Sequence, residues 1–328
     1  MPGRHKAAHE RGSQLPLTEL AKRIESDPGV IRKRGIRGVL RAFGEMEETT
    51  GLGDDCGFMK WGDDFLLLTT DCIRPAFLED PHFAGFAGVN VVVNDIYAMG
   101  GTPLMIVNTI CSPEGGDEWV RALAGGMQAA CAKFGVLMVG GHLDPDAGFH
   151  ALSVSALGKA HTLVTSFGAN PGDSVVIAFD LNGEAHFGNQ VWDASRKADP
   201  DIVQEKLQVM VALAEGGMVN AARDISNAGV LGSLQMLLEA SRVGAEIDLA
   251  AIPGPAHIPL DEWLFTFPSY GFVLAVPPRM TRQVTQLFAS HGLTAAGAGT
   301  VAEGRGILMR LGGSRAHIFS SGTILAPD

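Results

Sequence analysis

The stretch NVVVNDIYAMGGTPL, residues 90–104, decides the fold more than any other part of the chain. Its apolar residues follow a helical pattern that starts near residue 84, and the GGTP segment at 100–103 predicts where that helix ends. Asn94 and Asp95 interrupt the apolar pattern, and no turn explains them there. Because polar groups inside a buried helix need partners, we expect this helix to carry part of a functional site.

Two acidic segments precede this helix. GLGDDCGFM (51–59) contains Asp54 and Asp55, and the β-like run at 65–70 is followed at once by Asp71. Adjacent carboxylates repel each other and resist burial, so several of them among apolar segments indicate a bound cation. Oxygen ligands of this kind suit Mg²⁺, which binds a few carboxylates together with phosphate oxygens. Each aspartate alone is more often a turn or cap residue than a metal ligand, so only the combination predicts a metal site.

Length and composition exclude several classes of protein. The chain has 328 residues, a net charge of −11, 42 glycines and 46% apolar residues. The negative charge opposes binding to nucleic acid, and no apolar run approaches the ~20 residues of a membrane span. Four cysteines at irregular spacing, without a secretory leader, indicate a reduced, cytoplasmic protein. We therefore expect a globular protein that binds neither nucleic acid nor membrane.

Helices and strands alternate along both halves of the chain, which predicts an α/β or α+β fold with two domains. We expect a disordered tail over residues 1–14, a first domain over residues 15–160 and a second over residues 161–328. Two short helices are expected before residue 44, and the segment from residue 222 is expected to begin as a turn. Further helices are predicted over 117–134, 201–215 and 281–290, and strands over 104–110, 136–141, 151–158, 174–180 and 271–276.

A third candidate segment is VGGHLDP (139–145), which follows a predicted strand. Gly140 and Gly141 would let backbone N–H groups approach an anion closely, with His142 beside them. As a bare pattern this is unspecific, since a glycine-rich segment after a strand is usually only a turn.

A fourth candidate is ARDISNAGVLGSL (222–234), which leads into an apolar helix. Ser226 and Asn227 are explained equally well as an ordinary helix N-cap and as site residues. Asp224 precedes the cap and is the stronger functional candidate. The chain contains neither a G-x-x-x-x-G-K-[ST] loop nor a G-x-G-x-x-G segment after a strand.

Taken in order, six segments resemble the motifs of the ATP-binding superfamily related to aminoimidazole ribonucleotide synthetase, the PurM-like proteins. They are GLGDDCGFM (51–59), LLLTTDCI (66–73), NVVVNDIYAMGGTPL (90–104), VGGHLDP (139–145), FGANPGDSVVIA (167–178) and ARDISNAGVLGSL (222–234). The superfamily includes thiamine-monophosphate kinase, to which the GDD, TTD and NDIYAMGGTP segments are most similar, and selenophosphate synthetase. The resemblance implies a two-domain α/β (α+β) fold. Its N-terminal mixed sheet would form a barrel across a homodimer, and its C-terminal domain would be an α/β sandwich.

The resemblance also implies ATP bound through several Mg²⁺ ions, and phosphorylation chemistry without a P-loop. The implied metal ligands are Asp54, Asp71, Asp95 and Asp224. The implied nucleotide-binding residues are Asp55, Thr69, Thr70, Asn94, Gly140, Gly141 and His142. Such a site is physically coherent, because phosphoryl transfer requires mainly positioning and neutralisation of charge.

Three departures separate the chain from thiamine-monophosphate kinase. Leu78 stands where that kinase has a substrate-side histidine, His142 follows Gly141 where it has an acidic residue, and Asn227 replaces a carboxylate. The acceptor substrate therefore stays open. Selenophosphate synthesis is not indicated, because a reactive Cys and Lys near the N-terminus are missing. The hydrogenase maturation role is not expected either, because members of that type end in a cysteine tail and this sequence ends TILAPD.

The leading hypothesis is an ATP- and Mg²⁺-dependent phosphotransferase or ligase-type enzyme, a homodimer that acts on a small metabolite. One alternative is a non-catalytic ATP-binding subunit of a larger biosynthetic complex, because His142 and Asn227 stand in place of acidic residues. A metal-dependent hydrolase that uses His142 and Asp144 without ATP is the remaining alternative.

Overall fold

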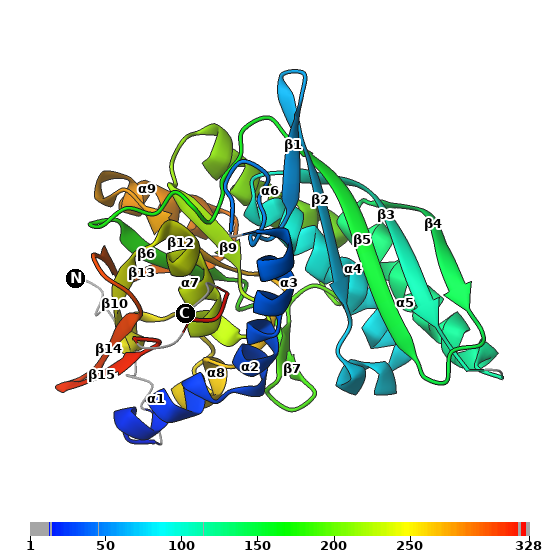
Figure 1. The fold of residues 1–328 in the computed structure, drawn as a ribbon, viewed down its shortest axis with the longest axis horizontal. Coiled ribbons are helices and arrows are strands. Elements are labelled where there is room, and N and C mark those ends of the chain that lie inside the picture. Colours follow the sequence, from blue (N-terminus) through cyan, green and yellow to red (C-terminus); the bar gives the residue numbers. More distant parts are fainter. Residues whose placement is uncertain (1–12, 14, 45, 114, 321–322, 326–328) are drawn as a thin grey trace, which may run out of the picture.

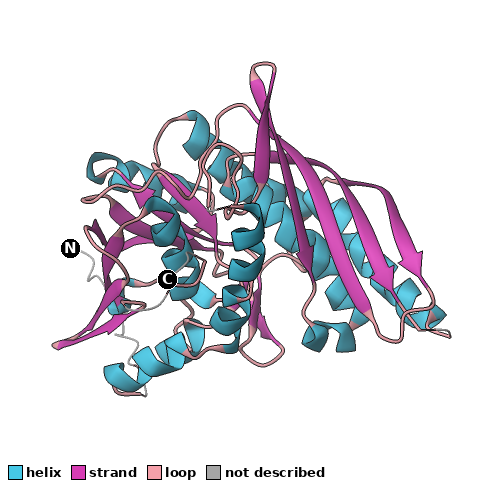
Figure 2. Ribbon diagram, in the orientation of Figure 1, coloured by secondary structure: helices cyan, strands magenta, loops and turns pink. Residues whose placement is uncertain are grey.

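The computed structural model describes residues 13, 15–44, 46–113, 115–320 and 323–325, so the tail expected over residues 1–14 falls outside this part except for Ser13. Over the described residues the chain forms two large β-sheets, each packed against helices, and a small third sheet (Figures 1 and 2). The expected mixed α/β fold is confirmed.

The first sheet has the strand order β1-β2-β5-β3-β4 in the described part of the chain. Its strands are β1 (Gly57–Trp61), β2 (Asp64–Cys72), β3 (Thr102–Cys111), β4 (Leu137–Asp144) and β5 (Ala151–Ala160). β3 and β4 run parallel, whereas the other neighbours run antiparallel, which confirms a mixed sheet. Within one described chain this sheet stays open between the edges β1 and β4, so the chain alone forms no barrel.

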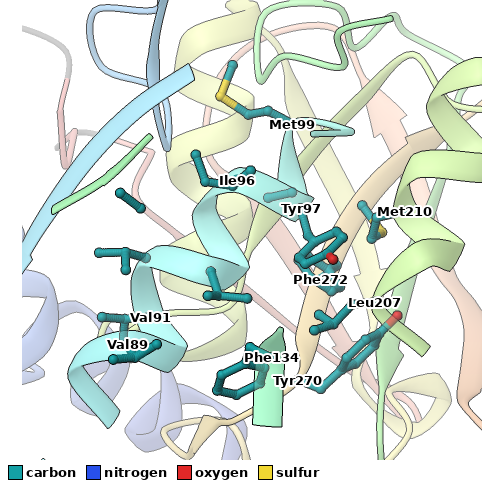
Figure 3. Packing of buried hydrophobic residues seen from close by; sticks show 14 of the residues in the cluster. Val89, Val91, Ile96, Tyr97, Met99, Phe134, Leu207, Met210, Tyr270 and Phe272 are labelled. Atoms are coloured by element: carbon teal, nitrogen blue, oxygen red, sulfur yellow. The ribbon is translucent and has the colours of Figure 1, made fainter. Parts of the chain in front are cut away.

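Two long helices, α4 (Pro81–Ala98) and α5 (Asp117–Phe134), cover one face of this sheet. Asp80 caps α4 by accepting a hydrogen bond of 3.0 Å from the Phe83 N–H, and Pro81 fits the first turn because its missing N–H is not needed there. α4 is apolar on nearly all sides because it lies between the sheet and the second domain. Figure 3 shows its side chains beside Leu207 and Phe272 of that domain.

α4 and α5 cross at two glycines. A Cβ added to Gly85 would lie 2.0 Å from the Leu123 carbonyl oxygen, and one added to Gly126 would lie 1.9 Å from the His82 carbonyl oxygen. The backbones therefore touch where any side chain would hold them apart. This close approach sets the position of α4, and so of Asp95, against the rest of the first domain.

The second sheet has the order β15-β14-β10-β13-β6-β12-β9 over the described residues. Its strands are β6 (Ser174–Phe179), β9 (Ala221–Asp224), β10 (Gly244–Asp248), β12 (Gly271–Val276), β13 (Thr294–Ala302), β14 (Ile307–Leu311) and β15 (Ser314–Ile318). Alternate residues of β6 enter different cores: Val176 packs with α4, α6 (Pro200–Glu215) and α9 (Thr281–Ser290), whereas Val175 packs with α7 (Gly229–Ser241). The sheet is thus covered on both faces.

Short elements complete the fold. They are the strands β7 (Glu184–His186), β8 (Val191–Asp193) and β11 (Phe267–Pro268) of the third sheet, the helix α8 (Leu260–Trp263), and the 3₁₀ turns η1 (Pro75–Glu79), η2 (Leu249–Ala251) and η3 (Pro278–Met280).

The N-terminal segment forms three helices instead of the expected two: α1 (Leu17–Glu25), α2 (Pro28–Arg34) and α3 (Ile36–Phe43). Asp27 caps α2, accepting a hydrogen bond of 2.7 Å from the Gly29 N–H. Leu20, Ile24 and Val30 pack into the core beneath the second sheet. This segment, which the sequence grouped with the first domain, therefore lies against the second.

The prediction that the segment from residue 222 begins as a turn is wrong. Residues 221–224 form the edge strand β9, whose Asp224 pairs antiparallel with Phe272 of β12. Four residues are too few to establish an alternating pattern, and the charged pair at positions 223 and 224 hides the burial of the strand.

None of the helices in the described chain combines the length and the apolarity that crossing a bilayer requires. All four cysteines are free thiols.

The crossing of α4 and α5 predicts that Gly126→Ala destabilises the fold by roughly 2 kcal/mol or more, because the added methyl group meets a carbonyl oxygen of a packed helix. The matched control is Gly125→Ala, whose Cβ would meet its nearest neighbour at 3.7 Å. That change should be neutral or stabilise by up to about 1 kcal/mol through helix propensity. Urea unfolding of both variants measures the difference, and equal stability would contradict the close crossing.

Candidate functional site

Three aspartates from separate segments converge where the two domains meet. Ligand oxygens of Asp55, Asp95 and Asp224 all lie within 4.8 Å of one another. Asp55 lies in the loop before β1, Asp95 in the last turn of α4, and Asp224 at the end of β9. We call these three residues the acidic cluster.

Strand β2 supports the cluster from one side. The Thr69 hydroxyl donates a hydrogen bond of 2.7 Å to Oδ2 of Asp95, which fixes that carboxylate. Side chains of a strand alternate between faces, so Asp71 lies on the same face as Thr69, and Thr70 lies on the opposite face. The Thr70 hydroxyl accordingly accepts a hydrogen bond of 2.9 Å from the Ser155 hydroxyl of β5, away from the cluster. The structure therefore brings Thr69 to the cluster and separates Thr70 from it.

Asp54 lies next to the cluster but is occupied by backbone and hydroxyl donors. It accepts hydrogen bonds from the Ser166 N–H at 2.8 Å and the Ser166 hydroxyl at 2.6 Å, and from the Asp55 N–H at 2.9 Å. Its side chain is fully buried. Asp54 thus orders the loop that presents Asp55, and its role as a metal ligand stays a prediction.

Arg223 is a buried cation at the edge of the acidic cluster. Its Nε lies 3.1 Å from Oδ1 of Asp55, and its Nη1 lies 3.9 Å from Oδ1 of Asp54. Nη1 also donates a hydrogen bond of 3.2 Å to the Gly53 carbonyl oxygen. Neither Arg223 nor Ser166 was predicted as a site residue from the sequence. The signal for Arg223 was a charged residue directly before Asp224, followed by an apolar helix.

The environment opposes ionisation of the clustered carboxyls. Burial raises the pKa of Asp55 to about 8 and the pKa of Asp224 to about 6, and it raises the pKa of Asp95 well above its usual value. The charges of neighbouring carboxylates add to the effect for all three, with Asp71 acting on both Asp95 and Asp224. Arg223 lowers the pKa of Asp55 and opposes the burial only in part.

This donor set fits a divalent cation. Three carboxylates within reach of one point supply hard oxygen ligands, and a cation would remove the mutual repulsion that burial intensifies. A single Arg223 guanidinium cannot balance the three charges. The site is therefore suited to Mg²⁺, whose remaining coordination positions accept phosphate oxygens or water.

Asn94 has a structural partner in the second domain. Its Nδ2 donates a hydrogen bond of 3.0 Å to the Ser269 carbonyl oxygen, and the Nδ2 of Asn90 donates to the same oxygen at 3.0 Å. Both asparagines thus join α4 to the segment before β12. The Oδ1 of Asn94 is buried and has no hydrogen-bond partner in the described residues. Its contact with a nucleotide stays a prediction.

Gly140 and Gly141 lie in strand β4, within the strand predicted over 136–141, and β4 continues through His142 to Asp144. β4 is the far edge of the first sheet, and β3 and β5 separate it from β2. Within one chain these residues therefore do not border the acidic cluster (Figure 1). Gly141 faces the Asn108 side chain, whose Oδ1 would be 2.6 Å from an added Cβ. A role in binding phosphate stays a prediction.

The sequence is similar to proteins of known and unknown activity. An uncharacterized protein of Synechocystis sp. is 36% identical over 310 residues, which cover 92% of this chain and 95% of that protein. The thiamine-monophosphate kinase of Pyrococcus horikoshii is 31% identical over 225 residues, which cover 66% of this chain and 72% of that enzyme. Among solved structures, AaThiL complexed with AMPPCP and TMP has a TM-score of 0.67 at 21% identity, over 86% of this chain and 93% of that chain. At this identity the structural likeness concerns the fold alone.

Two family models match consecutive parts of the chain. The N-terminal domain of AIR synthase related protein matches residues 53–160, and the C-terminal domain matches residues 171–311. Together they cover most of the chain and include all members of the acidic cluster. The resemblance inferred from the ordered motifs is thereby confirmed, and the chain belongs to the AIR synthase related, PurM-like superfamily.

Proposed function

We propose that this protein is a Mg²⁺- and ATP-dependent enzyme, of the phosphotransferase or ligase type, that acts on a small metabolite. The observation that carries the proposal is the acidic cluster, in which half-buried Asp55 and Asp95 and buried Asp224 converge from three segments. The similarity to the P. horikoshii kinase and to a structure that holds AMPPCP supports the use of ATP.

Each part of the site has a role in this proposal. Asp55, Asp95 and Asp224 would hold the metal, Thr69 would orient Asp95, and Arg223 would orient Asp55. A bound Mg²⁺ supplies neutralisation and orientation of phosphate oxygens, which is most of what phosphoryl transfer requires from a protein. The low-dielectric surroundings of the cluster strengthen these interactions.

The alternative of a non-catalytic subunit rests on the replacement of acidic residues by His142 and Asn227. Neither residue belongs to the acidic cluster within one chain, because His142 lies on β4 and Asn227 interacts with Arg74. The replacements therefore leave the three converging carboxylates in place. This observation favours an enzyme over a scaffold.

We also propose that two copies associate through the uncovered face of the first sheet. Leu68, Leu157, Met105 and Leu137 form one apolar row across four neighbouring strands on this face. Leu68 is 61% exposed and Leu137 is 68% exposed, so the row faces solvent in a single chain. Large exposed apolar patches mark interaction surfaces. Two such sheets packed face to face would bury the rows and form the barrel that the resemblance implies.

Asp95→Asn should weaken Mg²⁺-dependent binding of AMPPCP roughly tenfold or more, because it removes one of three charged ligands. The matched control is Asp63→Asn, an exposed carboxylate in the turn between β1 and β2. Isothermal titration with and without Mg²⁺ measures the effect. An Asp95→Asn protein that binds AMPPCP with the wild-type response to Mg²⁺ would contradict the assignment of the site. Wild-type protein that binds ATP but turns it over with none of a panel of metabolites would favour the non-catalytic subunit.

Leu137→Glu should convert a dimer into a monomer, because burial of an unpaired carboxylate in the apolar row costs several kcal/mol. Ile202→Glu is the control, since Ile202 is also exposed, at 49%, but lies on α6 of the second domain. Sedimentation velocity distinguishes the two states. A wild-type protein that stays monomeric at micromolar concentration, or a Leu137→Glu protein that stays dimeric, contradicts this interface.

A further inference from the structure

Cationic side chains gather next to the acidic cluster although the whole protein carries a net charge of −11. Arg32 and Lys33 belong to α2, and Arg74 follows β2 directly before the turn η1. In the described part of the chain no carboxylate lies within 4.0 Å of their charged nitrogens. We call Arg32, Lys33 and Arg74 the cationic group.

Contacts at Asn227 bring these residues together. α2 packs directly on the turn after β9, because a Cβ on Gly29 would lie 1.9 Å from the Asn227 carbonyl oxygen. From the other side, Nη1 of Arg74 donates a hydrogen bond of 3.4 Å to the Asn227 Oδ1. Asn227 lies three residues after Asp224, so the cationic group borders the acidic cluster. Arg74 is further held over the Phe77 ring, 5.1 Å from its centroid.

The charges in this group are only partly balanced. Burial lowers the pKa of Arg74, and the like charge of Arg32 lowers it further, whereas Asp27 raises it. The Asp27 carboxylate is already engaged as the cap of α2. Lys33 lies close enough to the cluster to lower the pKa of Asp224. The guanidinium groups of Arg32 and Arg74 are close enough for their like charges to interact, and an added anion would stabilise both.

An asparagine at position 227 suits a site in which Arg74 is available to an added anion. An amide orients Arg74 through its oxygen and adds no negative charge beside the guanidinium. An aspartate of the same shape would form an ion pair with Arg74 and cancel the charge. Asn227 therefore positions Arg74 without neutralising it.

We propose that the cationic group binds an anionic group, a phosphate or a carboxylate, of the acceptor substrate, between Arg32 and Arg74 beside the metal site. This proposal rests on the proposed ATP-dependent function, because it places the acceptor next to the phosphates of the nucleotide. Arg32 and Arg74 would supply bidentate donors to the anion.

The test is titration of the full-length protein with inorganic phosphate, and separately with malonate, in the presence of saturating Mg²⁺ and AMPPCP. Wild-type protein should bind at least one of the two anions, and the tighter one identifies the acceptor group as phosphate or carboxylate. Asn227→Asp and Arg74→Gln should each weaken that binding about tenfold or more, because both remove the free charge of Arg74. Arg282→Gln, at an exposed position on α9, is the control for a general effect of charge and should leave it unchanged.

Several outcomes would overturn the proposal. Wild-type protein that binds neither anion would contradict it, and so would wild-type anion affinity in Asn227→Asp and Arg74→Gln. Anion binding that disappears when AMPPCP is bound would assign the cationic group to the nucleotide instead of the acceptor. Failure of the proposed function is detected separately, as the absence of Mg²⁺-dependent AMPPCP binding. Titration of the nucleotide-free protein with phosphate and malonate still measures binding at the anion site in that case.

Discussion

The site depends on the ion pairs that the buried guanidinium of Arg223 forms with Asp54 and Asp55. The guanidinium extends from β9 of the second domain to Asp54, Asp55 and the Gly53 carbonyl oxygen in the loop of the first. A buried charge deprived of its partner costs on the order of 3–5 kcal/mol, so the loop and the strand are held as one unit. Asp224 follows Arg223 directly, and its N–H donates a hydrogen bond of 2.9 Å to Oδ2 of Asp55. The same contact that joins the domains thus assembles the acidic cluster.

Much of the fold is predictable from local patterns. The predicted bounds of the helix over 117–134 and of the strand over 271–276 agree with α5 and β12, because each has clear periodicity and distinct ends. β9 was missed because four residues carry too little pattern. The packing of α1 to α3 on the second sheet was also missed, since hydrophobic spacing tells which face of a helix is buried but not against which sheet.

The site is also predictable only in part, because local sequence identifies some of its residues and the fold alone decides the position of the others. Asp95 stands out because nothing local explains a carboxylate in an apolar helix. Asp54 and Asp55 are equivalent in sequence, and only the fold directs one to Ser166 and the other to the cluster. Thr69 and Thr70 are likewise separated by the alternation of β2. Arg223 and Ser166 come from distant segments, so no local pattern predicts their contacts with the loop before β1.

The central claim is that Asp55, Asp95 and Asp224 hold the metal through which this acidic protein binds ATP. The most direct measurement is a crystal structure of the protein with Mn²⁺ and AMPPCP, with anomalous diffraction used to locate the manganese. The account predicts an anomalous peak coordinated by carboxylate oxygens of these three residues and by phosphate oxygens of the nucleotide. A nucleotide bound elsewhere, or manganese without contact to the three carboxylates, would contradict it.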